Sequence, residues 1–297
     1  MNLQGKSIDQ LNQELVAFHP DNLDPTPLDL VDQYKTLVDV GRNQWATKRV
    51  VFAGLARNIE LQMQLNAARL AQTFERCKEA VLVVLENNSQ DKTRLVLENL
   101  RANNSNRVFL LGQNDSEPDL RDFSQQRIHR MARYRAEIQS FVRANFSDWD
   151  LLVLIDLDMW GGWSMDGLMT SLAWGPFDVM GSNGRARDHR GLVQYDRWAF
   201  MFHSWEEEWS TRQDSSMEWF FYWNPPRGAK PVQCLSVFGG LAVYSMPAYL
   251  AGEYGSHIQI EGQARGCVEH AAFHYSLVGQ GYGGIYLNPS QRVTVNW

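Results

Sequence analysis

Short apolar runs alternate with longer amphipathic segments through the middle of the chain. The apolar runs lie at residues 49–53, 80–85, 108–111 and 151–155, and the amphipathic segments between them at 59–77, 92–103 and 124–145. Runs of this length without polar alternation are typical of strands that are buried on both faces of a parallel sheet. The alternation of strand and helix predicts an α/β fold with a doubly wound sheet, which binds ligands at the carboxyl ends of its strands.

Residues 1–48 precede this alternation and have a different pattern. Ser7 can cap a helix that runs to Pro20, and apolar side chains at helical spacing predict a second helix from Leu30 to about Gly41. We expect this N-terminal helical extension to pack on the main domain, which spans residues 49–297. A docking surface for a partner protein is the alternative interpretation of the two helices.

Charge and composition exclude several classes of protein. The chain has 28 Lys and Arg against 34 Asp and Glu, a formal net charge of −6, so it lacks the basic footprint of a nucleic-acid-binding protein. No apolar run approaches the roughly 18 residues that a transmembrane helix requires. The three cysteines predict neither a disulfide framework nor a zinc site. We therefore expect a cytoplasmic protein, with peripheral association with a membrane as an alternative.

Tryptophan is unevenly distributed along the chain. Nine of the eleven tryptophans lie in one segment: Trp149, Trp160, Trp163, Trp174, Trp198, Trp205, Trp209, Trp219 and Trp223. Large aromatic rings are often buried in the core, but they also stack on the faces of sugar rings. We expect several of these side chains to line a saccharide-binding groove.

Two acidic residues follow the fourth apolar run directly. Asp156 and Asp158 are two positions apart, so in an extended chain their carboxylates point to the same side. Paired carboxylates are typical of sites for Mg²⁺ or Mn²⁺, which retain coordination positions for phosphate oxygens. The alternative is that the two acids cap a turn. A phosphatase nucleophile is disfavoured, because it would follow the first strand and have Thr or Val where this chain has Trp160.

Taken together, several segments resemble a known enzyme family. In chain order they are VVFAGLARN (50–58), LENNSQDKT (85–93), RIHRMARYRAE (127–137), LLVLIDLDM (151–159), YDRWAF (195–200), SVFGGLAVY (236–244), CVEHAAFHYSL (267–277) and GGIYLNP (283–289). Their order and spacing are similar to those of GT-A-type glycosyltransferases, and more narrowly to the cryptococcal mannosyltransferase-like family of capsule-associated α-1,3-mannosyltransferases. The resemblance implies a GT-A-like mixed sheet with a Rossmann-like nucleotide-binding half at about 49–158 and an acceptor-binding half at about 159–297.

The resemblance also implies a set of residues that bind the nucleotide-sugar. Asp156 is one of them, as the first carboxylate of the metal-binding pair. The others in the nucleotide-binding half are Arg57, Glu86, Asn88, Arg127 and Arg135. Arg127 and Arg135 are eight residues apart, which places them about 80° apart around a helix, near enough to share a side. A turn at Asn88 and a solvated basic helix face are the alternatives to ligand binding.

In the acceptor-binding half, the resemblance implies a second cluster. Its members near the sugar and the acceptor are Tyr195, Asp196, Trp198, Gly239 and Gly240. Glu269 would act as a base or as an electrostatic stabiliser of the transition state, with Asp156 as the other catalytic residue. His270 and His274 share a helix face, and we expect one of them, with a slight preference for His274, to complete the metal site with Asp156 and Asp158.

The sequence thus predicts a metal-dependent glycosyltransferase with a nucleoside-diphosphate sugar as donor and a saccharide or glycoconjugate hydroxyl as acceptor. The resemblance implies GDP-mannose as the donor and retention of configuration. The segment 202–223 is unusually aromatic and acidic, so the acceptor does not follow from the resemblance. The alternative is a tryptophan-rich carbohydrate-binding protein that holds a divalent metal without turnover.

Overall fold

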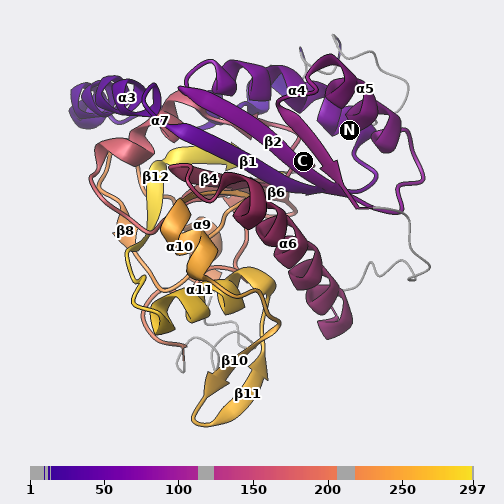
Figure 1. Cartoon of the computed structure of the whole chain (residues 1–297). Coiled ribbons are helices and arrows are strands. Elements are labelled where there is room, and N and C mark those ends of the chain that lie inside the picture. The colour runs from indigo at the N-terminus through magenta and orange to yellow at the C-terminus, as the bar shows by residue number, and fades with distance from the viewer. Residues whose placement is uncertain (1–9, 11–12, 14, 113–123, 206–217, 296–297) are drawn as a thin grey trace.

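The computed structural model of the chain is a layered α/β structure with one central sheet (Figure 1). The structure describes residues 10, 13, 15–112, 124–205 and 218–295, and Ser7, the expected start of the first helix, lies outside these ranges. Among the described residues, no helix is long and apolar enough to cross a membrane.

Ten strands form the central sheet. They are β1 (Arg49–Ala56), β2 (Glu79–Glu86), β3 (Val108–Leu111), β4 (Leu151–Ile155), β5 (Gly162–Trp163), β6 (Val179–Asp188), β7 (Gly191–Gln194), β8 (Val232–Gln233), β9 (Leu241–Ser245) and β12 (Ile285–Thr294). The order is β3-β2-β1-β4-β9-β6-β12-β5, with β7 beside β6 and β8 beside β12. The first four strands are parallel, and β9 lies antiparallel between β4 and β6. A separate hairpin consists of β10 (His257–Ile260) and β11 (Gln263–Gly266).

Helices cover both faces of the sheet, as Figure 1 shows. One face carries α3 (Val31–Trp45), α4 (Glu60–Phe74), α5 (Thr93–Asn103) and α7 (Met165–Ala173), and the other α6 (Gln125–Phe146), α9 (Glu218–Tyr222), α10 (Met246–Ala251) and α11 (Glu269–Gly279). Successive side chains of a strand point to opposite faces, so Phe52 packs in the α4 layer and Val51 in the α6 layer. Both are fully buried, which explains why the strands are apolar without alternation.

The structure confirms the predicted α/β class and the four parallel strands of the first half. β1 continues three residues past the expected end at Ala53, because its pairing with β2 extends to Ala56. The sequence pattern did not reveal β6 and β12, whose buried positions include polar side chains such as Asn183 and Arg292. These groups are hydrogen bonded inside the fold, so burial there does not require an apolar sequence.

The described part of the N-terminal extension packs against the main domain. A 3₁₀ turn, η1 (Val16–Phe18), leads into the short helix α2 (Pro20–Leu23), and a second turn, η2 (Leu28–Leu30), leads into α3. Asp21 is 2.9 Å from the guanidinium of Arg227, and Asp24 is 3.0 Å from that of Arg292. Both arginines are at least 95% buried, so the carboxylates of the extension neutralise charge inside the domain.

Helix α3 extends past the predicted end at Gly41 to Trp45 and packs closely on α7. A side chain at Gly41 would place its Cβ 2.0 Å from the backbone oxygen of Met169, so this crossing requires glycine. We expect Gly41→Ala to lower the free energy of unfolding by about 1–3 kcal/mol, although alanine favours a helix by about 1 kcal/mol.

Urea unfolding of Gly41→Ala beside Val40→Ala measures this effect, because Val40 is on the same helix and 41% exposed. Val40→Ala should change the free energy of unfolding little. A Gly41→Ala variant as stable as the wild type would show that α3 is not held closely against α7.

Candidate active site

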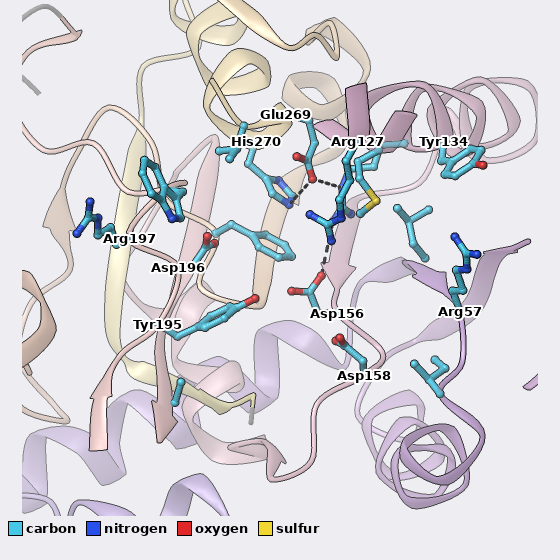
Figure 2. Close-up of a pocket in the computed structure, with 18 of the residues that line it drawn as sticks. Arg57, Arg127, Tyr134, Asp156, Asp158, Tyr195, Asp196, Arg197, Glu269 and His270 are labelled. Atoms are coloured by element: carbon cyan, nitrogen blue, oxygen red, sulfur yellow. Dashed lines mark hydrogen bonds and ion pairs between the residues drawn. The ribbon is translucent and has the colours of Figure 1, made fainter. Parts of the chain in front are cut away.

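A pocket of about 1140 Å³ opens where the connectivity of the sheet changes direction. From β1 the chain continues outward to β2 and β3, whereas β4 pairs with β1 on its other side. The loops after β1 and β4 therefore diverge, and in open α/β sheets the crevice between such loops is where ligands bind. Arg57 and Asn58 after β1, and Asp156 and Asp158 after β4, line this pocket (Figure 2).

Hydrogen bonds to backbone and amide groups hold the loop after β4 in place. The backbone N–H of Asp156 donates to the oxygen of Gly240, 2.9 Å away. The buried amide of Asn66 on α4 donates to the backbone oxygens of Leu157 and Met159 at 3.2 and 2.8 Å. These contacts fix the backbone on both sides of Asp158, so both carboxylates are presented to the pocket by a rigid loop.

Arg135 on α6 lies at the centre of the acidic side of the pocket. Its side chain is only 3% exposed, and its guanidinium is 3.1 Å from the Glu269 carboxylate and 3.5 Å from that of Asp156. These two carboxylates raise the pKa of the guanidinium against the opposing effect of its burial. Arg135 therefore lines the pocket as predicted, but its charge is directed to two protein carboxylates rather than left for a phosphate.

On the acidic side of the pocket, four carboxylates surround the single guanidinium of Arg135. Burial and then repulsion from Asp158 raise the pKa of Asp156 well above its usual value, against the attraction of Arg135. Removal from water within the pocket also raises the pKa of Asp158. Asp196 and Glu269 line the same pocket and add to the negative potential at Asp156. An added cation beside Asp156 and Asp158 would offset this repulsion.

Two histidines of α11 have very different surroundings. His274 is fully buried away from the pocket, where its Nδ1 is 2.8 Å from the Ser236 hydroxyl and its Nε2 3.0 Å from that of Tyr244. Burial lowers the pKa of His274 to about 3. His270 lines the pocket, is 5% exposed and stacks on Phe238 with ring centroids 3.8 Å apart.

Neither ring nitrogen of His270 has a hydrogen-bond partner in the described structure, and Nε2 lies 3.7 Å from the Glu269 carboxylate. Burial, followed by the nearby charge of Arg135, lowers the pKa of His270 well below its usual value, so the ring is neutral. Figure 2 shows Glu269 and His270 next to each other, with Asp156 below them. A neutral imidazole with an unused nitrogen is a competent metal ligand.

The wall opposite the carboxylates is basic. We call it the basic wall and define it by Arg57 after β1 and by Arg127 and Arg130 on α6. Ser124 caps α6, with its hydroxyl accepting from the Arg127 backbone N–H at 3.2 Å, and so fixes the start of the helix where Arg127 lines the pocket. Arginine matches the geometry of phosphate oxygens, which makes this wall suitable for a diphosphate.

Glu86 and Asn88 do not line the pocket. Glu86 is 1% exposed, accepts from the backbone N–H of Ser89 at 3.1 Å and forms an ion pair with Arg94 at 3.2 Å. Asn88 has a left-handed φ of +56°, so it shapes the turn after β2. The polar residue of this loop that does line the pocket is Asn87, whose amide donates to the Tyr134 hydroxyl.

The loop after β7 supplies the third side of the pocket. Tyr195, Asp196 and Trp198, the residues expected near the sugar and the acceptor, all line it. Asp196 has an unusual left-handed φ of +68°, and burial raises the pKa of its carboxyl to about 7. This carboxylate accepts from the Gly239 backbone N–H at 3.1 Å.

Gly239 and Gly240 lie behind the pocket rather than in it. Both have left-handed φ values, and a Cβ at Gly239 would lie 2.2 Å from the backbone oxygen of Ser182. Glycine is therefore required for packing at this point. The pair reaches the pocket through its backbone, because Gly240 accepts from Asp156 and Gly239 donates to Asp196.

Most of the described tryptophans do not line the pocket. Trp198 does, with 39% of its side chain exposed, whereas Trp163, Trp205 and Trp223 pack in the hydrophobic core. Trp209 lies outside the described residues. The expectation that several tryptophans line a saccharide-binding groove is therefore wrong for Trp163, Trp205 and Trp223. Their large apolar surface is buried by packing in the core.

The pocket also contains residues that sequence reasoning missed. They are Arg130, Tyr134, Arg187, Arg190 and Phe221. Arg197 and Phe238, which also line the pocket, lie in two of the segments that carry the resemblance. Helical spacing from Arg127 would have indicated Arg130 and Tyr134, which lie three and seven positions further along the same helix. Arg187 at the end of β6 and Arg190 after it had no such signal, because the sequence does not show that this hairpin turns toward the pocket.

Asp156 and Asp158 fit a divalent metal, although the site is not a complete cage. Within the described ranges, no three His, Cys, Asp or Glu side chains converge closely enough to hold an ion by themselves. Mg²⁺ and Mn²⁺ commonly take one or two carboxylates and complete their coordination with water and substrate phosphate. Two aligned carboxylates facing a basic wall match this requirement.

No protein-family model matches the chain, and no curated protein matches it by sequence. Among solved structures, GalNAc-T7 with UDP, GalNAc and Mn²⁺ is 13% identical over 84% of this chain and 44% of its own, with a TM-score of 0.48. A mannosyltransferase from Pyrobaculum calidifontis, in complex with GDP-Man and Mn²⁺, is 10% identical over 98% and 68% of the two chains, with a TM-score of 0.44.

Glucosyl-3-phosphoglycerate synthase from Mycobacterium tuberculosis, in complex with Mn²⁺, UDP and phosphoglyceric acid, is 13% identical over 89% of this chain and 72% of its own, with a TM-score of 0.41. The chain spans less than half the length of GalNAc-T7. Likenesses with TM-scores below 0.5 assign neither an activity nor a ligand to this chain, and the resemblance to the cryptococcal mannosyltransferase-like family stays a prediction.

Proposed function

We propose that this protein is a metal-dependent glycosyltransferase that moves a sugar from a nucleoside-diphosphate sugar to a hydroxyl of a saccharide or glycoconjugate. The observation that carries the proposal is the pair Asp156 and Asp158, which faces the basic wall across the crevice between the β1 and β4 loops. In open α/β sheets, nucleotides bind in such a crevice. A metal held by carboxylates and a group of arginines both neutralise the charge of a diphosphate.

Asp156 and Asp158 would hold Mn²⁺ or Mg²⁺, and His270 is the third candidate ligand. The structure favours His270 over His274 for this role, because both nitrogens of His274 are already hydrogen bonded outside the pocket. When bound, the metal would neutralise the charge that develops on the leaving diphosphate. Arg57, Arg127 and Arg130 would bind the outer phosphate oxygens.

Arg135 acts as a positioning residue in this proposal. It binds Glu269 and Asp156 at once, so it fixes the distance between α11 and the loop after β4. Because the Glu269 carboxylate is tied to this guanidinium, we assign to Glu269 the electrostatic stabilisation of positive charge on the transferred sugar rather than proton removal. Retention of configuration and a GDP-mannose donor are the finer parts of the proposal, and they rest on the sequence resemblance.

The first prediction concerns the metal pair. Calorimetric titration with UDP and with GDP should show binding of one of them that is at least about tenfold tighter with Mn²⁺ than without it. Asp158→Asn should abolish this Mn²⁺ dependence, because it removes one of two charged ligands, and should reduce hydrolysis of the matching nucleotide-sugar by about 100-fold or more.

Asp148→Asn is the matched control, since Asp148 precedes β4 and its side chain is 74% exposed. It should retain the full Mn²⁺ effect. If the wild type binds neither nucleotide at any Mn²⁺ concentration, the glycosyltransferase proposal fails and the carbohydrate-binding alternative replaces it.

The second prediction separates the two histidines of α11. His270→Ala should weaken Mn²⁺-dependent nucleotide binding by about tenfold or more. It should lower the free energy of unfolding less than His274→Ala does, because it removes the stacking of a buried ring on Phe238 but no hydrogen bond. His274→Ala should lower the free energy of unfolding by about 2–4 kcal/mol, because it leaves a cavity and an unpaired Tyr244 hydroxyl and removes one of the two hydrogen bonds of Ser236.

Nucleotide titrations with Mn²⁺ and urea unfolding of both variants measure these effects at a temperature where both are folded. The assignment is reversed if His274→Ala loses the Mn²⁺ effect while His270→Ala keeps it.

A further inference from the structure

The pocket carries a second group of arginines, on the side away from the basic wall. We call it the arginine–aromatic wall and define it by Arg187, Arg190, Arg197, Trp198 and Phe221. It is formed by the end of β6, the loop after β7 and helix α9. Figure 2 shows Arg57 and Arg197 on opposite sides of the two metal-site carboxylates, so the two basic regions face different parts of a bound substrate.

Two of these arginines lie over aromatic rings. The guanidinium of Arg190 lies 3.6 Å from the ring centroid of Phe221 and is paired with the Asp188 carboxylate. The guanidinium of Arg197 lies 4.8 Å from the ring centroid of Trp198. Stacking of this kind orients a guanidinium and limits its rotamers, so its edge is presented to the pocket in a fixed direction.

Arg187 differs from its neighbours in having no carboxylate partner in the described structure. Its guanidinium lies over the ring of Phe18 at 5.8 Å, and its side chain is exposed at the pocket. Asp188 is engaged by Arg190, and Asp196 is buried against the Gly239 backbone. The charge of Arg187 is therefore uncompensated where a ligand would lie beside it.

The uncompensated positive charge of Arg187 is suited to an anionic ligand rather than to a neutral saccharide. Hydroxyl groups are commonly recognised by amides and carboxylates. Beside this wall the amide is that of the buried Gln194, and the carboxylates of Asp188 and Asp196 are bound by Arg190 and by the Gly239 backbone N–H. Arginine binds planar or tetrahedral oxyanions through two parallel hydrogen bonds. The adjacent exposed Trp198 provides an apolar face on which a sugar ring can stack.

We propose that the acceptor is an anionic saccharide, whose ring stacks on Trp198 and whose carboxylate, phosphate or sulfate is bound by Arg187. This inference rests on the proposed glycosyltransferase function and names the substrate class of its acceptor site. The donor diphosphate belongs to the basic wall, so the anion bound here is a second one, carried by the other substrate.

The test uses the full chain with Mn²⁺ and a saturating concentration of the nucleotide that it binds, so that the basic wall is occupied. Calorimetric titration compares neutral methyl glycosides of glucose, galactose and mannose with the matching methyl uronides and methyl glycoside 6-phosphates. In at least one series, the uronide or the 6-phosphate should bind about tenfold more tightly than its neutral counterpart. This preference should decrease between 50 and 300 mM NaCl.

Arg187→Gln should reduce the preference about tenfold, and Arg187→Lys should retain part of it, because lysine keeps the charge but not the two-pronged geometry. Arg101→Gln is the control, since Arg101 is an exposed arginine of α5 outside the pocket. It should leave the preference unchanged. Uronide and phosphate arms together identify which anion the wall accepts.

Each failure points to a different proposal. If the protein binds a nucleotide with Mn²⁺ but shows equal affinity for neutral and anionic glycosides, or keeps its preference in Arg187→Gln, the anionic-acceptor inference is overturned alone. If it binds no nucleotide, the glycosyltransferase proposal is overturned, and titration without nucleotide then decides whether Arg187 still confers a preference for anionic sugars.

Discussion

The buried ion pair network around Arg135 is the interaction on which the pocket depends. One guanidinium, 3% exposed, lies between the carboxylates of Asp156 and Glu269, which are 113 residues apart in the sequence. An unpaired charge at this depth would cost several kcal/mol, so the three groups are stable only together. The network therefore aligns helix α6, the loop after β4 and helix α11, and the position of every other group in the pocket follows from that alignment.

The charges of the pocket are separated rather than mixed. Carboxylates gather at the loop after β4 and at the start of α11, while arginines occupy the two flanking walls. Burial raises the pKa of Asp156 and of Asp158, and repulsion from Asp158, Asp196 and Glu269 raises that of Asp156 further. Under the proposed function, a donor that brings both a metal and a diphosphate would neutralise both signs of charge at once.

The sequence predicted the parts of this structure that local patterns determine. The four parallel strands follow from unbroken apolar runs, and the placement of Asp156 and Asp158 follows from the end of one such run. How deeply a side chain is buried and which groups it contacts were not predictable from local patterns. Helical spacing placed Arg135 on the side of α6 that faces the pocket, but it did not show that two carboxylates would bind it. Nor did it distinguish His270 from His274, because that difference depends on Ser236 and Tyr244, which are distant in the sequence.

The glycine pair behind the pocket has a consequence for how this site can change. Gly240 accepts a hydrogen bond from Asp156, and Gly239 donates one to Asp196, so the backbone of this glycine pair supports acids on both sides of the pocket. A shift of this backbone would displace Asp156 and Asp196 together. A substitution that moves the glycine pair therefore cannot change the position of one acid without the other. Arg187, at the exposed end of β6, has no such tie to the loop after β4. Divergence in acceptor choice is therefore least constrained at that strand end, where substitution leaves the geometry of the acidic centre intact.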